Sequence, residues 1–301
     1  MGVGVVIPCH TEQRWAGLCA AVASVLAQRP APAGVVVVVD HNEPLYRRAH
    51  ADLSGVTVLR NGFPERGVSG TRNTGVYHLD TPVVALLDDD ASAHPGWLAG
   101  LTAPFADPAV CGTGGAIRPA WESGRPRWVP DEFLWAWGGS YTGLPTTTAP
   151  VRNVWSASMA VRREVFAKVD GFRVGFGKVG DRSRPEDTDL CLRMTGASGG
   201  RWMYVPDALI DHPVPADKAT VRYFVTRCYH EGRGKVALAR LNPGRESLGS
   251  ERAYLRRTLP AGIARGVAGT VRDPAGVARA GAILLGAAAA AFGGLVEVVH
   301  R

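Results

Sequence analysis

The sequence of 301 residues has few cysteines, and their spacing forms no disulfide or metal-binding pattern. Cys9, Cys19, Cys111, Cys191 and Cys228 are scattered and odd in number, and no C-x-x-C pair occurs. A disulfide framework and a cysteine metal cage are therefore not indicated. The first residues also lack the basic start and the cleavage site of a signal peptide. These absences favour a reduced protein of the cytoplasm.

Long hydrophobic runs are scarce, and the one candidate lies near the C-terminus. Residues Ala280–Val296 are 17 uncharged positions between Arg279 and Glu297, mostly alanine and glycine. A helix of that length spans about 25 Å, which is less than the ~30 Å of a bilayer's hydrocarbon core. We expect a helix that lies on a membrane surface rather than one that crosses it. The alternative is a helix packed on the rest of the chain or on a partner copy.

An acidic excess is missing overall, since the formal charge is +7. Residues 1–217 hold 20 basic and 22 acidic side chains, whereas residues 218–301 hold 14 and 5. The whole basic excess therefore lies in the last quarter of the chain, where it suits an anionic membrane surface. Nucleic acid is not expected as a partner, because no nucleic-acid-binding module occurs.

Short apolar runs alternate with helical patterns in the first half of the chain. With 46% hydrophobic residues a packed core is expected. The valine run Gly34–Val39 is typical of a strand buried on both faces. Alternation of this kind predicts an α/β domain with a mostly parallel sheet flanked by helices. The strands expected there are Val3–Ile7, Gly34–Val39, Val56–Leu59 and Pro82–Leu87.

The domain organisation follows from where this alternation weakens and from where long helices begin. The pattern loosens after Ile117, resumes with a strand at Ala157–Val161, and gives way to long helices from Asp217. We expect one domain over residues 1–217, with halves of about 1–117 and 118–217. Residues 218–301 are expected to form a basic helical extension for membrane-surface or oligomer contact.

Three adjacent carboxylates, Asp88, Asp89 and Asp90, follow the strand that ends at Leu87. Ligands of open α/β sheets bind beyond the carboxyl ends of the strands. Adjacent carboxylates repel unless a cation lies among them, and a hard divalent ion with oxygen ligands would offset this repulsion. The triplet therefore indicates a metal-diphosphate site, with a solvated turn or a helix N-cap as the alternative.

Three further motifs carry chemistry. Arg66–Gly75 combines glycines, small hydroxyls and Arg72 at a helix start, where backbone N–H groups can face an anion. Glu186 and Asp187 open another helix, where they either supply a general base or complement the helix dipole. His212 follows a strand and would complete a metal site begun by Asp90.

These motifs, in this order, resemble family 2 glycosyltransferases with the GT-A fold over about residues 3–215. The fold implied is α/β and Rossmann-like, with a mostly parallel central sheet and a C-terminal helical extension. Trp128–Arg193, with Val-Pro-Asp-Glu-Phe at 129–133 and Arg152-Asn153, is further similar to a subgroup that includes archaeal lipid-linked (dolichyl-phosphate-glucose type) glucuronosyltransferases.

The resemblance implies a role for each candidate residue. Asp187 would be the catalytic base, with Glu186 the next candidate, and Asp90 and His212 would hold Mn²⁺ or Mg²⁺. Acceptor contacts would come from Trp155, Ser158 and Met159, and the tryptophan-rich segment 118–155 would stack on a sugar or prenyl group or form core. The donor would bind to Pro8, Asp40, Arg66, Arg72, Asp88 and Asp89.

The activity implied is an inverting, metal-dependent transfer of one hexose or hexuronic acid from a nucleoside-diphosphate sugar, with UDP favoured. The Gln-x-x-Arg-Trp signature of processive relatives is absent after Asp187, so one sugar per acceptor is expected. The acceptor would be a hydroxyl of a lipid-linked or cell-surface glycan precursor, reached at the inner face of the plasma membrane. A homodimer is left open. The alternatives are a nucleotidyltransferase and a non-catalytic carbohydrate-binding protein.

Overall fold

The computed structural model describes residues 2–179, 182–241 and 252–299. The chain divides into two compact units: Met1–Ile117 with Pro145–His212, and Arg118–Leu144 with Pro213–Arg301. This division differs from the predicted one, because residues 118–144 belong with the C-terminal helices and not with the preceding sheet. The reason is the aromatic content of this segment, whose side chains pack into the core of the second unit.

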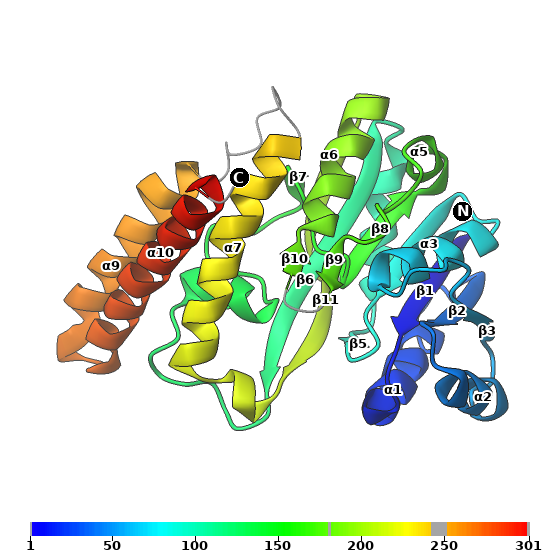
Figure 1. Cartoon of the computed structure of the whole chain (residues 1–301), viewed down its shortest axis with the longest axis horizontal. Coiled ribbons are helices and arrows are strands. Elements are labelled where there is room, and N and C mark those ends of the chain that lie inside the picture. Colours follow the sequence, from blue (N-terminus) through cyan, green and yellow to red (C-terminus); the bar gives the residue numbers. More distant parts are fainter. Residues whose placement is uncertain (1, 180–181, 242–251, 300–301) are drawn as a thin grey trace. The chain divides into compact units, whose positions relative to one another are not determined.

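A nine-stranded mixed sheet organises the first unit (Figure 1). Its strands are β1 (Val3–Cys9), β2 (Gly34–Val39), β3 (Thr57–Arg60), β4 (Val83–Leu87), β5 (Ser92–Ala93), β6 (Val110–Trp121), β7 (Ala149–Val151), β8 (Ser158–Arg162) and β11 (Arg201–Val214). The order is β3-β2-β1-β4-β8-β6-β11-β5, with β7 paired to β11. Strands β1 to β4 pair in parallel, whereas β8 is antiparallel to β4 and β6. The parallel core predicted from the sequence is confirmed.

Helices cover both faces of this sheet. They are α1 (Trp15–Leu26), α2 (Glu43–Asp52), α3 (Val68–His78), α4 (Trp97–Thr102), α5 (Arg163–Lys168) and α6 (Glu186–Ser198), with short η1 (Glu12–Arg14) and η2 (Ala103–Ala106). Val5 and Ile7 of β1 pack with α1, α2 and α4, while Val6 between them packs with α3, α5 and α6. This alternation follows from the two-residue period of a strand.

β8 was predicted in the second half of the sheet, whereas β6 was not, and glycine explains part of that omission. β6 contains Gly112 and Gly114, and glycine is depleted in strands. Both glycines are required by packing: a Cβ at Gly112 would lie 2.3 Å from the Trp202 ring, and one at Gly114 would lie 2.3 Å from Val154. The glycine-rich segment before α6 contains a hairpin of β9 (Gly177–Val179) and β10 (Arg182–Arg184).

The C-terminal unit is helical. It contains η3 (Asp131–Trp137), η4 (Ala216–Lys218), α7 (Val221–Leu241), η5 (Tyr254–Thr258), α9 (Leu259–Ala268), η6 (Gly269–Val271) and α10 (Ala275–Val299). Trp137 stacks on Phe224 with ring centroids 5.6 Å apart and planes 7° apart. Phe133 and Ile283 complete this centre. The tryptophan-rich segment therefore forms core here, which was one of the two predicted roles.

The C-terminal helix is longer than the uncharged run from which it was predicted. α10 has 25 residues, and its most apolar window has a mean hydropathy of 2.1. By length and composition alone it is the one helix, among the described residues, able to cross a membrane. Core helices of soluble proteins can have the same length and hydropathy. The environment of α10 therefore has to be inferred from its contacts.

Candidate active site

The acid triplet lies at the carboxyl end of β4, as expected from the buried strand before it. All five residues of β4 are buried. β11 reaches the same place because Asp211 pairs with Ser92 of β5, two residues after the triplet. One ligand atom each from Asp88, Asp90 and His212 lie within 4.8 Å of one another. The sequence predicted Asp90 and His212 as metal ligands and assigned Asp88 to the donor, but only the pairing of β5 with β11 brings His212 to the two carboxylates.

This group fits a divalent cation. Asp90 Oδ1 lies 3.4 Å from His212 Nε2. Asp90 Oδ1 and His212 Nδ1 are both buried without a hydrogen-bond partner among the described residues. A bound ion would satisfy such an orphaned carboxylate oxygen, and carboxylate ligands suit Mg²⁺ and Mn²⁺.

Arg14, which the sequence did not single out, occupies the other side of the triplet. Its Nη1 lies 2.9 Å from Asp89 Oδ1 and 3.0 Å from Asp90 Oδ2. Burial raises the pKa of Asp89 to about 7, with Arg14 opposing and Asp90 reinforcing that shift. Asp89, expected to bind the donor, therefore faces Arg14. No local signal in the sequence marked Arg14, because its partner Asp89 lies 75 residues further along the chain and only the fold brings the two together.

Arg72 is the central buried cation of the site. It extends from α3 and lies 2.8 Å from Asp88 Oδ1 and 3.6 Å from Glu186 Oε1. Burial works against its charged form, but Asp88, Asp187 and Glu186 raise its pKa. Its Nε and Nη1 are buried without a hydrogen-bond partner among the described residues. Arg72 thus links the acid triplet to the acid pair of α6 and retains donors for an anionic ligand.

Asp40, directly after β2, is held by three donors. Its Oδ1 accepts from Asn61 and faces His41 Nδ1, each at 2.8 Å, and its Oδ2 accepts from the Gly67 N–H at 2.9 Å. Gly67 directly precedes α3 and has a φ of 138°, a backbone conformation that favours glycine. Although burial opposes the shift, these hydrogen bonds lower the pKa of Asp40. Asp40 is therefore an ionised, fixed acceptor.

Arg66 and Pro8, the remaining donor candidates, have different surroundings. Arg66 is exposed and donates from Nη2 to the His41 carbonyl at 3.1 Å. Pro8 is buried within β1, opposite Val38 of β2. A side chain in that place supports the strand end, and the contact of Pro8 with the donor stays a prediction.

Glu186 and Asp187 form the first turn of α6. Burial, reinforced by the neighbouring carboxylate, raises the pKa of Glu186 to about 8. Burial also raises the pKa of Asp187, opposed by Arg72 and by hydrogen bonds with Ser156. A raised pKa makes an ionised carboxylate a stronger proton acceptor, which is the property of a general base.

The predicted acceptor residues are buried or partly buried. Met159 has no exposed surface and packs in the core beside α6. Ser158 is buried and accepts a hydrogen bond from Trp97 Nε1 at 3.0 Å. Trp155 is partly buried against the core that contains α1. Ser158 and Met159 therefore contribute to packing in this structure, and their contact with an acceptor stays a prediction.

With this geometry established, comparison with known proteins identifies the family. Residues 4–170 match the family model described as glycosyl transferase family 2. The chain belongs to this family. The enzyme is therefore a glycosyltransferase, and the nucleotidyltransferase and binding-protein alternatives are not retained. The matched residues include the acid triplet, whereas the Glu186–Asp187 pair and His212 lie beyond them.

A curated relative extends the similarity of this glycosyltransferase to nearly the whole chain. It is the glucosyl-dolichyl phosphate glucuronosyltransferase of Haloferax volcanii, 29% identical over 299 residues, which is 97% of this chain and 95% of that protein. The predicted likeness to this subgroup is confirmed.

Two solved structures confirm the GT-A fold of the glycosyltransferase. PcManGT, a mannosyltransferase from Pyrobaculum calidifontis in complex with GDP-Man and Mn²⁺, has a TM-score of 0.59 and 16% identity, over 95% of this chain and 86% of that one. GalNAc-T7 with UDP, GalNAc and Mn²⁺ has a TM-score of 0.55 and 19% identity, over 84% of this chain and 53% of that one.

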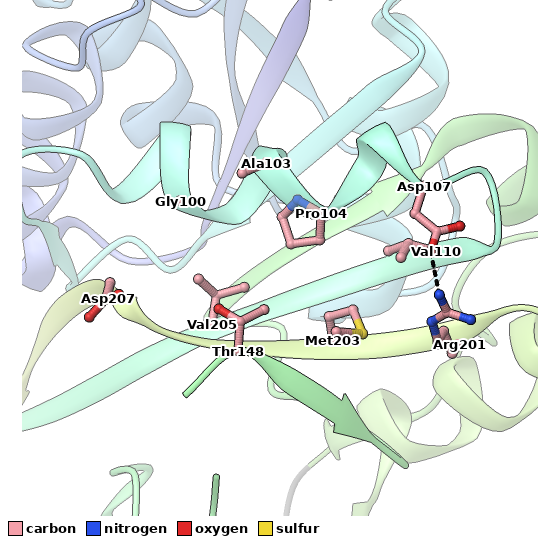
Figure 2. Close-up of a pocket in the computed structure, with 10 residues that line it drawn as sticks. All are labelled: Gly100, Ala103, Pro104, Asp107, Val110, Thr148, Arg201, Met203, Val205 and Asp207. Atoms are coloured by element: carbon pink, nitrogen blue, oxygen red, sulfur yellow. Dashed lines mark hydrogen bonds and ion pairs between the residues drawn. The ribbon is translucent and has the colours of Figure 1, made fainter. Parts of the chain in front are cut away.

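The glycosyltransferase also has a hollow away from these residues. It has a volume of about 460 Å³ and lies between α4, η2 and β11, with Arg201 and Asp107 paired at one end (Figure 2). Apolar side chains such as Val205 and Met203 line much of it. None of the predicted site residues is among its lining, so size alone does not mark the active site.

Proposed function

We propose that this glycosyltransferase transfers one hexose or hexuronic acid from a nucleoside-diphosphate sugar to a hydroxyl acceptor, with inversion at the anomeric carbon. The observation that carries the proposal is a continuous group of charged side chains. Asp88, Asp90 and His212 form the cation site, and Arg72 joins Asp88 to Glu186 of the acid pair. A diphosphate needs the cation, and the attacking hydroxyl needs the base.

The donor half of the proposal assigns Asp88, Asp90 and His212 to Mn²⁺ or Mg²⁺. When bound, the ion would act as a Lewis acid toward the diphosphate leaving group. Arg72 would direct its free N–H donors to the diphosphate, and Asp40 would accept a hydrogen bond from the base. UDP is favoured as the nucleotide, and the two similar solved structures hold UDP with Mn²⁺ and GDP-Man with Mn²⁺.

The acceptor half assigns proton removal to Asp187. Its raised pKa allows it to take the hydroxyl proton as the oxygen attacks the anomeric carbon. A single displacement of this kind inverts the configuration. Ser156 would hold the Asp187 carboxylate in place, since its side chain and its backbone hydrogen-bond to it.

The acceptor itself is proposed to be lipid-linked. The similarity to the glucosyl-dolichyl phosphate glucuronosyltransferase supports this choice. Such an acceptor remains in a membrane, so we place the enzyme on the inner face of the plasma membrane, with the basic residues of 218–301 toward anionic lipid. Catalysis is proposed to belong to the first compact unit, which ends at His212 rather than near residue 217. A homodimer is compatible with the apolar face of α10.

The proposal is tested with the full chain and a panel of UDP-, GDP- and dTDP-sugars. Thermal shift is measured for each sugar nucleotide with Mn²⁺, with Mg²⁺ and with EDTA, followed by nucleotide release in the presence of lipid-linked acceptors. We expect a metal-dependent shift with a UDP-sugar and a product of inverted anomeric configuration by NMR. Absence of a shift with every sugar nucleotide would overturn the proposal.

A further inference from the structure

The C-terminal unit contains a cavity of about 490 Å³ on which four arginines converge. They come from the segment before η3, from α9 and from the start of α10: Arg125, Arg127, Arg265 and Arg279. Three carboxylates line the same cavity: Asp131, Glu132 and Asp273. The pairing of these seven groups decides whether the cavity can bind an anion.

Two of the arginines are matched by one carboxylate each. Arg125 lies 2.6 Å from Asp131, and Arg265 pairs with Glu132, whose side chain is nearly buried. Gly262 makes room for the second pair, because a Cβ there would lie 2.4 Å from Glu132 Oε1. These two pairs are neutral and add no net charge to the cavity.

The other two arginines share a single carboxylate. Arg127 and Arg279 each lie 2.7 Å from an oxygen of Asp273, which also accepts from the Ala275 N–H at the start of α10. Two guanidiniums bring about ten N–H donors, more than the roughly four lone-pair sites of one carboxylate can accept. The cluster therefore keeps a positive charge and unused donors, which suit the oxygens of a phosphate.

Exposed valines surround the turn that joins α9 to α10. Val267 and Val277 are more than half exposed, and Val271 in η6 is 96% exposed. A free phosphate or a nucleotide would leave these side chains in water. A phospholipid brings acyl chains beside its phosphate, so it matches both the arginines and the valines.

The apolar surface continues along α10, which lies beside α9 (Figure 1). Leu284 and Leu295 are exposed on one face, and Phe292 beside them is exposed although its ring centroid lies 6.0 Å from that of Tyr229. The opposite face packs closely on α7, where Arg233 pairs with Glu297 at 2.8 Å. Because this ion pair ties α10 to the charged helix α7, α10 is better suited to the surface of a bilayer than to the hydrocarbon core of the bilayer.

We propose that Arg127 and Arg279 form a binding site for the phosphate of an anionic phospholipid, with the valines of the α9–α10 turn and the outer face of α10 among the acyl chains. The inference rests on the membrane-surface part of the proposed function and deepens it. It replaces a diffuse basic surface with a defined headgroup site.

The test is flotation of the full chain with phosphatidylglycerol vesicles and with phosphatidylcholine vesicles. The double variant R127Q/R279Q is compared with the matched control R47Q/R48Q, which removes two exposed, ion-paired arginines of α2. We expect the cavity variant to lose roughly fivefold in phosphatidylglycerol affinity per arginine, and the control to match the wild type. R127K/R279K should restore part of the loss, and inorganic phosphate should compete weakly, since it lacks acyl chains.

V271D provides a second variant that does not depend on the arginine cluster. Because Val271 is 96% exposed, we expect the fold of this variant to stay intact. V271D should also weaken vesicle binding. Equal binding of wild type, R127Q/R279Q and V271D would overturn the proposal. The proposal also fails if the full chain does not bind vesicles and light scattering shows that V271D converts a dimer to a monomer. The exposed apolar surface of α9 and α10 would then contact a second copy of the chain.

Failure of this inference can be distinguished from failure of the proposed function. D90A should float as the wild type does, because the change lies at the cation site. R127Q/R279Q should keep the metal-dependent thermal shift with a sugar nucleotide. A protein that shows the thermal shift but no phosphatidylglycerol preference would retain the transferase proposal and refute the headgroup site.

Discussion

The first unit buries charged side chains, whereas the C-terminal unit exposes apolar ones. Arg72 and Asp89 are almost inaccessible to solvent, although long charged side chains are seldom fully buried. In the C-terminal unit Phe292, Leu295 and Val271 have most of their surface in solvent. In most proteins charged side chains are exposed and large apolar ones are buried. The first unit departs from this pattern in its charged residues, and the C-terminal unit departs from it in its apolar residues.

The two departures indicate two kinds of ligand. A buried cation with unpartnered donors is costly unless a charged ligand completes it, so it indicates a site for an anion. An exposed apolar stripe on a long helix is costly in water and indicates a surface that something apolar covers. The chemistry of the enzyme is therefore expected from the first unit and its attachment from the second.

The strongest test of this division is removal of a carboxylate from the cation site. Asp90→Ala should lower transfer by at least ~10³-fold and abolish metal-dependent donor binding, because stabilisation of the leaving diphosphate is worth several kcal/mol. The fold should survive in circular dichroism. Asp80→Ala is the control, since that side chain is 98% exposed. Near-normal turnover with Mn²⁺ would show that the cation is held elsewhere.

Removal of the proposed base separates chemistry from binding within the first unit. Asp187→Asn keeps the size of the side chain and removes its proton affinity, so kcat should fall by ~10²-fold or more with the donor Kd little changed. Steady-state kinetics and donor titration measure the two quantities. A loss confined to the donor KM would move the base to another group, with Glu186 next.

Arg14 allows a test of how the first unit balances its buried charge. Arg14→Gln removes a cation that lies 3.0 Å from Asp90 Oδ2, so Mn²⁺ should bind ~3–10-fold more tightly in the absence of nucleotide. Isothermal titration measures this, with Arg47→Gln on the surface of α2 as the control. Weaker Mn²⁺ binding would instead mean that Arg14 positions Asp90 for the metal.

The smallest effect concerns stability and pH. Because the pKa of Glu186 is raised to about 8, the native state holds a proton that the unfolded state releases from about 4.5 upward. This contribution to stability is complete below pH 4.5 and is lost as the pH rises to 8. Glu186→Gln should reduce the slope, by at most ~1.4 kcal/mol per pH unit, in urea denaturation at several pH values, and Asp89 and Asp187 should account for the slope that is left. An unchanged slope, with Glu164→Gln as control, would contradict the raised pKa.

The local signals of the chain were sufficient for the parallel strands and for most charged candidates. The valines of β2 and the apolar run before Asp88 predicted buried parallel strands, because continuous β-branched residues fit only a sheet covered on both faces. The same logic placed Asp40 and the triplet at strand ends. β6 was missed because its glycines have no strand preference of their own and are fixed there by Trp202 and Val154.

The sequence by itself determined the family, the α/β class and the positions of the acid triplet and acid pair, since these depend on residues close together in the chain. Only the tertiary structure decided which groups meet. Pairing of β11 with β5 brings His212 to Asp90, and η1 brings Arg14 to Asp89. Packing also turned Met159 into core and grouped residues 118–144 with the C-terminal helices. Contacts between residues about 75 to 120 positions apart are set by the whole fold, and a local pattern does not encode them.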